Sequence, residues 1–134
     1  LELYASRITL MENINQRITK EEGFNDQKLF DFNSLLEGYL SGNKLEVEEV
    51  SKVAKYLALG ISNCINFVNP SMVVIGDEFS HFGENFLKSI KTEVKMRLLP
   101  KTYETVEIML SSKKNDSVLE GAFINSITKT YLTP

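Results

Sequence analysis

Apolar residues along the chain recur at spacings of three and four over several long stretches, which predicts a mainly helical protein. One helix is indicated between Leu3 and Ile18, and a shorter one begins near Asp31. The clearest pattern covers residues 45–68, where one apolar stripe contains Val47, Val50, Ala54, Leu57, Ala58, Ile61, Ile65 and Val68. We expect this long helix to stop at Asn69-Pro70, since a residue before proline is disfavoured in helical angles.

Two short β-branched segments interrupt the helical patterns in the second half. Residues 72–75 (Met-Val-Val-Ile) predict a buried strand, and residues 105–110 predict a second strand. A helix from about Phe82 to Leu99, ended by Pro100, lies between them, and a last helix is expected from Asn115. A strand, a helix and a strand with a connection of about thirty residues form a βαβ unit, so the strands should be parallel. The pattern therefore predicts an α/β fold.

Two parallel strands alone make a poor sheet, because parallel sheets are covered on both faces and flanked by further strands. We therefore expect more strands upstream of residue 1 and interpret residues 1–134 as one partial domain of a longer protein. The absence of a methionine at Leu1 agrees with this interpretation.

Polar and reactive residues within these elements have structural explanations. Asn43 and Glu46 match a capping box at the start of the long helix. Glu46, Glu48 and Glu49 also fit solvated acids that interact with the helix dipole. His81, the single histidine, is expected in a solvated turn, and Cys64 is expected as a small buried core residue.

Composition and charge exclude several classes. The chain is 43% apolar and 25% charged with a net charge of −3, which is typical of a globular domain and offers no basic surface to DNA. No apolar run approaches the roughly 18 residues of a spanning helix. A single cysteine cannot form an internal disulfide, which fits a cytoplasmic protein without a membrane anchor. No phosphate-binding glycine motif, histidine triad or multi-histidine metal site can be built.

Three segments in order resemble the carboxyl-terminal part of the ROK family, which groups bacterial sugar-responsive repressors with sugar kinases. Residues 1–6 are similar to the segment after the family's zinc motif, where a Leu-Glu pair leads into a helix. Residues 59–76 are similar to its long helix, Asn/Asp-Pro turn and strand, and residues 120–123 resemble the start of its final helix. The resemblance implies an actin-like, ribonuclease-H-like ATPase fold. Zinc ligands, a catalytic aspartate and any DNA-binding region would lie upstream, so this chain would hold no catalytic residue, metal or cofactor.

The resemblance implies one residue in contact with a ligand. Glu2 matches a glutamate of the family that accepts hydrogen bonds from sugar hydroxyls. A helix-start acid is the structural alternative for Glu2. Gly76 and Asp77 mark the nucleotide site in degenerate form, because the kinases have two glycines there. An acid at position 77 would repel phosphates, which favours a repressor over a kinase.

The resemblance therefore implies a sugar-binding and dimerisation part of a xylose-repressor-like regulator. Xylose and glucose are the candidate monosaccharides, a homo-oligomer is expected, and DNA would be contacted only through the upstream region. A sugar kinase of the same family and a dimerisation module without a ligand are the two alternatives.

Overall fold

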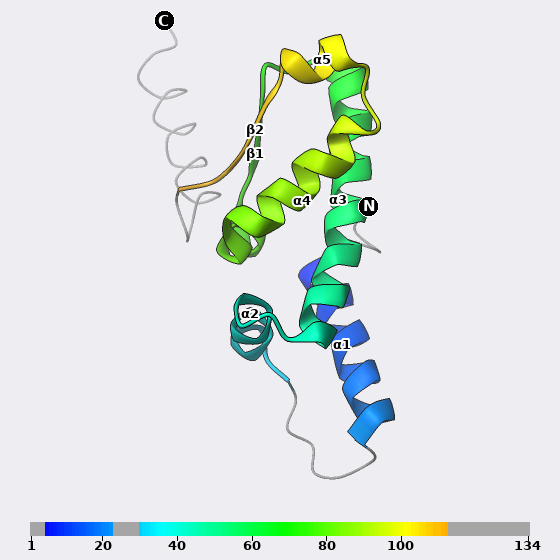
Figure 1. Ribbon diagram of the computed structural model, residues 1–134, viewed down its shortest axis with the longest axis vertical. Helices are drawn as coiled ribbons and strands as arrows, with labels where there is room; N and C mark the ends of the chain where they lie inside the picture. The colour runs from blue at the N-terminus through cyan, green and yellow to red at the C-terminus, as the bar shows by residue number, and fades with distance from the viewer. Residues whose placement is uncertain (1–4, 23–29, 113–134) are drawn as a thin grey trace, which may run out of the picture.

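A long helix organises the computed structural model, which describes residues 5–22 and 30–112. Figure 1 shows α1 and α2 beside the lower half of this helix, α3, and α4 beside its upper half. The elements in chain order are α1 (Arg7–Glu22), α2 (Phe32–Leu40), α3 (Lys44–Val68), β1 (Met72–Ile75), the 3-10 helix η1 (Asp77–Phe82), α4 (Gly83–Lys95), α5 (Pro100–Glu104) and β2 (Glu107–Leu110).

The apolar stripe of α3 forms the centre of the core. Ala54, Ala58 and Ile65 on this stripe are almost completely buried, whereas Val68 at the helix end is exposed. The helix ends where the sequence predicts, at Asn69, which adopts a left-handed conformation with φ 51°. Asparagine tolerates this conformation better than most residues with a side chain.

The two strands form a parallel pair, as the βαβ pattern predicts. Met72 pairs with Glu107 and Ile75 with Leu110 in the register. Ile75 and Ile108 are buried, but Met72 and Val74 are about half exposed. The prediction of a buried strand therefore holds for one face of β1 only, because alternate residues of a strand point to opposite faces.

Helix α4 is shorter than predicted, although its inward residues are correct. The buried residues include Phe86, Ile90 and Val94, but the helix ends at Lys95 instead of Leu99. Pro100 does not end this helix; it begins α5. Proline is favoured in a first helical turn because the amide hydrogen that it lacks would have no partner in the helix there.

The junction of α2 and α3 differs from the predicted capping box. Asn43 precedes α3, but its side chain makes no capping hydrogen bond. Glu46 is instead buried against α2, where a Cβ atom added to Gly38 would lie 2.6 Å from its Oε1 atom. Gly38 thus permits a close approach of the two helices, which a side chain would prevent.

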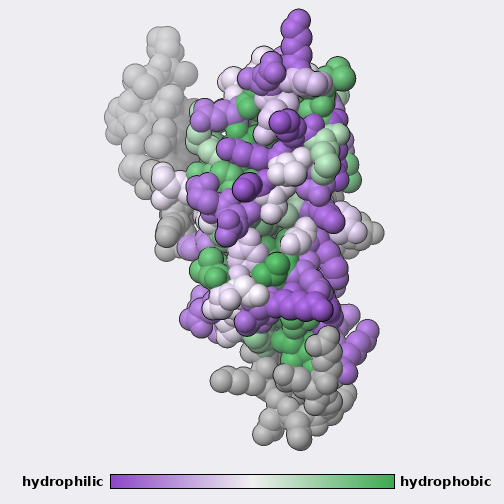
Figure 2. Space-filling model, viewed as in Figure 1, coloured by the Kyte–Doolittle hydropathy of each residue, from purple (hydrophilic) through white to green (hydrophobic). Residues whose placement is uncertain are grey.

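On the face shown in Figure 2, hydrophilic side chains cover most of the surface and apolar ones emerge in separate patches. No helix in residues 5–22 and 30–112 is long and apolar enough to cross a membrane. The predicted helix from Asn115 lies outside the described residues.

Candidate functional site

The carboxyl end of β1 leads directly into the candidate site. Gly76 is half-buried and has an extended backbone, with φ −103° and ψ −167°, so its backbone angles do not demand a glycine. Asp77 begins η1, which follows without an intervening loop. The side chain of Asp77 and the whole of Glu2 lie outside the described part, so their predicted roles stay predictions.

An aromatic cluster fixes η1 against the helices. The Phe82 side chain, only 1% exposed, lies at its centre. Its ring centroid is 5.1 Å from that of Tyr39 and 5.7 Å from that of Phe32, both in edge-on geometry, and 5.2 Å from that of Phe86. Phe79 stacks on Phe86 at 6.0 Å. Burial in this cluster raises the pKa of the Tyr39 hydroxyl. Since edge-on and offset pairs are the favoured aromatic geometries, η1 has a firm attachment to α2 and α4.

Arg7 connects the start of α1 to the turn after β1. Its guanidinium donates a hydrogen bond to the Glu78 carboxylate, next to Asp77 in the chain. The same guanidinium lies over the Phe32 ring, 5.3 Å from the ring centroid. Three elements, α1, α2 and η1, therefore meet at one arginine.

A second group of charged side chains lies between α1 and α3 and consists of Arg17, Glu48, Glu49 and Lys52. The position of Glu49 contradicts the sequence prediction. The Glu49 side chain is only 2% exposed, so it is not a solvated helix-start acid. Its Oε1 accepts hydrogen bonds from Arg17 Nη1 at 2.7 Å and Lys52 Nζ at 2.6 Å. Arg17 also donates to the more exposed Glu48 at 3.1 Å.

These contacts set the charge states of the group. Burial by itself raises the pKa of the Glu49 carboxyl, but the hydrogen bonds from Lys52 and Arg17 outweigh burial and leave the pKa below its ordinary value of 4.5. The hydrogen bonds to Glu49 and Glu48 raise the pKa of the Arg17 guanidinium. These side chains are therefore charged at neutral pH, and their ion pairs link α1 to α3.

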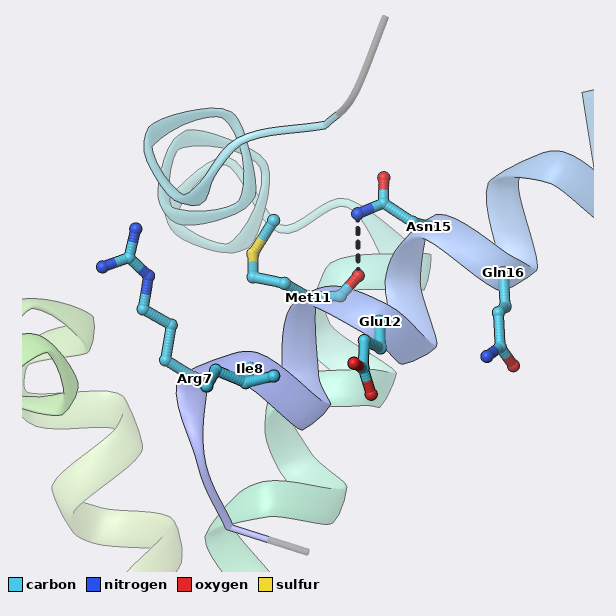
Figure 3. Close-up of a pocket in the computed structure, with 6 residues that line it drawn as sticks. All are labelled: Arg7, Ile8, Met11, Glu12, Asn15 and Gln16. Atoms are coloured by element: carbon cyan, nitrogen blue, oxygen red, sulfur yellow. Dashed lines mark hydrogen bonds between the residues drawn. The ribbon is translucent and has the colours of Figure 1, made fainter. Parts of the chain in front are cut away.

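An open groove of about 610 Å³ runs along α1 (Figure 3). Its lining residues are Arg7, Ile8, Met11, Glu12, Asn15 and Gln16. Asn15 donates to the Met11 carbonyl at 2.9 Å and accepts from the Phe30 amide at 3.2 Å, so its polar atoms are engaged. The polar groups are spread along one helix instead of converging, which makes the groove a poor sugar site.

The remaining candidate residues form no site. Cys64 is exposed, so its prediction as a core residue is wrong, because it lies beside the buried stripe of α3 and not within it. His81 is half-buried in the last turn of η1. Among the described residues, no three His, Cys, Asp or Glu side chains gather as a metal ion would require.

The fold and the strand-end turn define a class of protein. The helix-rich chain with its parallel strand pair has the actin-like ATPase fold. The model of the ROK family matches residues 1–129, and the chain belongs to this family. A crystal structure of a ROK family transcriptional regulator superposes with a TM-score of 0.78 at 20% identity, over 90% of this chain and 31% of that one.

Relatives include both regulators and kinases. An uncharacterised protein of Clostridium perfringens is 31% identical over 90% of this chain and 39% of its own length. A putative xylose repressor of a Caldicellulosiruptor species is 27% identical over 100% of the chain and 35% of its own length. A glucokinase of Halalkalibacterium halodurans is 33% identical over 54% of the chain and 22% of its own length. The chain thus spans less than two-fifths of these relatives.

The structure brings together features that the sequence keeps far apart. Arg7, five residues after Glu2, reaches Glu78 beside the predicted marker pair Gly76 and Asp77. Sequence reasoning missed Arg7, Glu78 and the burial of Glu49. A lone charged residue in an amphipathic helix carries no signal of its partner, because the partner is set by how the helices cross.

Proposed function

We propose that this chain forms the carboxyl-terminal sugar-binding and dimerisation part of a sugar-responsive transcriptional regulator. The observation that carries the proposal is the extent of similarity: the putative xylose repressor matches the whole chain, whereas the glucokinase matches about half. Sugar binding would bias the closure of two lobes and so alter a DNA-binding region elsewhere in the protein. Xylose and glucose are the monosaccharides to test first.

Asp77 supports a regulator over a kinase. A carboxylate at the end of β1 would stand where nucleotide phosphates approach, in place of the second glycine of the kinases. Two unit charges about 4 Å apart repel by roughly 4 kcal/mol at an effective dielectric of about 20. Glu78 adds a second acid to the same turn, although Arg7 pairs with it.

The sugar role of Glu2 gives the first prediction. Glu2→Ala in the intact protein should weaken monosaccharide affinity at least about tenfold, because a carboxylate that accepts hydrogen bonds from sugar hydroxyls contributes roughly 1.5–3 kcal/mol. Isothermal titration calorimetry with D-xylose and D-glucose measures the change.

Glu12→Ala, an exposed acid further along α1, is the matched control and should leave the affinity unchanged. Unchanged affinity in Glu2→Ala would favour the alternative in which the chain is a dimerisation module without a ligand. If the wild-type protein bound no common monosaccharide, the proposal of a sugar sensor would fail.

The glucokinase match supports a second candidate, an ATP-dependent sugar kinase. A coupled assay that measures ADP release from the intact protein in the presence of each sugar distinguishes the two. Sugar-dependent ATP turnover would overturn the regulator proposal, whereas sugar binding without turnover would support it.

We propose that a second copy of the chain binds the outer stripe of α3, which we define by Tyr56, Leu59 and Phe67. These residues are 42%, 46% and 93% exposed. They share one face of the helix, as their spacing requires. We predict that Phe67→Asp converts a dimer of the intact protein into a monomer, because a charge cannot be buried there without a partner.

Size-exclusion chromatography with light scattering measures the oligomeric state. Met96→Asp, at an apolar position that is 67% exposed at the end of α4, is the control and should remain dimeric. A wild-type monomer at high concentration, or a dimeric Phe67→Asp variant, would contradict the assignment.

A further inference from the structure

A cavity of about 270 Å³ lies between α1 and α3, beside the charged side chains that link these two helices. Arg17 and Lys20 line it from α1, and Glu49 and Lys52 line it from α3. The members of each pair are three residues apart, which places them on one face of their helix. Polar side chains from two helices therefore converge on one volume, in contrast to the groove along α1.

The lining of this cavity has an excess of positive charge. It contains three cations and one acid, which is an excess of two charges. Glu48 pairs with Arg17 from outside the lining and reduces the excess to one. The whole chain, by contrast, has a net charge of −3. A concave site of one sign raises the local concentration of ions of the opposite sign, so the cavity attracts anions.

The lining also offers hydrogen-bond donors to a ligand. An ammonium group has three N–H donors, and within residues 5–22 and 30–112 Lys52 donates to Glu49 only. Lys20 is exposed and makes no ion pair or side-chain hydrogen bond within the same residues. Asn13 and Gln16, each four residues before a cation of α1, add side-chain amides to the lining.

The buried Glu49 carboxylate holds two of the cations in place. Arg17 Nη1 lies 2.7 Å and Lys52 Nζ 2.6 Å from its Oε1 atom, so both are positioned at the cavity without a ligand. Side chains that are already ordered lose less conformational entropy when a ligand binds. A metal cation would be repelled by this lining, and an uncharged sugar would leave its positive excess without a counter-charge.

We propose that the cavity between α1 and α3 binds a small oxyanion of the phosphate class through Lys20, Lys52 and Arg17. Its volume is below the roughly 300 Å³ at which pockets for drug-sized ligands begin, which suits inorganic phosphate or a small phosphate monoester. The phosphate oxygens would accept charge-assisted hydrogen bonds from the two lysines. The site goes beyond the proposed sugar-binding function and does not depend on it.

Titration of the intact protein with inorganic phosphate, followed by phosphorus NMR at neutral pH and constant ionic strength, tests the site. The wild type should bind with a dissociation constant of about 1 mM or lower. Lys20→Gln should weaken the affinity about three- to tenfold, because it removes a charged donor without removing a described contact of the fold. Glu48→Gln should strengthen it about two- to threefold, because it removes a nearby negative charge.

Lys101→Gln is the matched control, since it removes the same charge at an exposed position of α5. In Figure 1, α5 lies at the upper end of α3, whereas α1 lies beside its lower half, so the affinity should not change. Equal losses in Lys20→Gln and Lys101→Gln, or no loss in Lys20→Gln, would overturn the inference. Displacement of phosphate by an equal concentration of chloride would also overturn it, because the cavity would then not select an oxyanion.

A parallel titration with glycerol phosphate distinguishes the two sources of the anion. At least about tenfold tighter binding than inorganic phosphate, lost in Lys20→Gln, would support a phosphate monoester as the ligand. Equal or weaker binding would support inorganic phosphate. If neither compound bound the wild type, the inference would fail, whereas the sugar-binding proposal would be unaffected.

Discussion

Replacing Phe82 by alanine should lower the free energy of unfolding by about 3–5 kcal/mol, the range for a buried aromatic residue. Phe82 is 1% exposed and its ring meets those of Phe32, Tyr39 and Phe86 at centroid distances between 5.1 and 5.7 Å. The lost ring would leave a cavity where α2, η1 and α4 meet. The turn after β1 would also lose part of its attachment, since only the contact of Phe79 with Phe86 would remain among its aromatic contacts, so η1 should become more open to proteolysis.

Urea unfolding of the intact protein measures the loss. Leu40→Ala, on α2 but 63% exposed, is the control, and its effect should stay within about 0.5 kcal/mol. Equal effects of the two substitutions would mean that the cluster around Phe82 does not hold these elements together.

The order of elements could be predicted because each carries a local pattern. The stripe of α3 identifies its bounds, and the βαβ spacing identifies the parallel pair of β1 and β2. The end of α4 could not be predicted, because Leu98 remains buried beyond the last helical residue. Apolar periodicity reports burial, and burial continues past Lys95 although the helix does not.

The charged residues were predicted worst, and for a physical reason. Glu46 and Glu49 both lie in the first two turns of α3, where the helix dipole alone explains acids. Their burial is caused by helices that pack across them: α2 approaches Glu46 at Gly38, and α1 brings Arg17 to Glu49. The local sequence predicts neither of these helix-helix contacts.

The sequence predicted where along the chain the candidate site lies, but not which side chains meet there. The strand ending at Gly76 could be found from its apolar residues and its glycine, and η1 does follow it directly. The contact of Glu78 with Arg7 spans 71 positions and joins two ordinary charged residues. This contact can be seen only in the structure, where the start of α1 packs against the aromatic cluster.

Glu49→Gln should lower the free energy of unfolding by roughly 1.5–3 kcal/mol at pH 7, the range for hydrogen bonds to a charged group. The buried carboxylate accepts from Arg17 and Lys52 through one oxygen atom. An amide keeps an oxygen acceptor but loses the negative charge that makes both bonds strong. Urea unfolding of the intact protein at a series of pH values measures the effect.

The pH dependence follows from the lowered pKa of Glu49. A carboxyl whose pKa is lower in the folded than in the unfolded state adds stability above its ordinary pKa, here 4.5, and that stability is lost as the pH falls through the folded value. The difference between wild type and Glu49→Gln should therefore be largest at neutral pH and shrink below pH 4.5, because the wild-type carboxylate is protonated first in the unfolded state and then, at lower pH, in the folded state. Glu48→Gln is the matched control: its side chain is 42% exposed and shares only Arg17, so the loss should stay below about 1 kcal/mol at every pH. A Glu48→Gln variant as unstable as Glu49→Gln, or a Glu49→Gln difference that persisted in acid, would show that the buried carboxylate is not what ties α1 to α3.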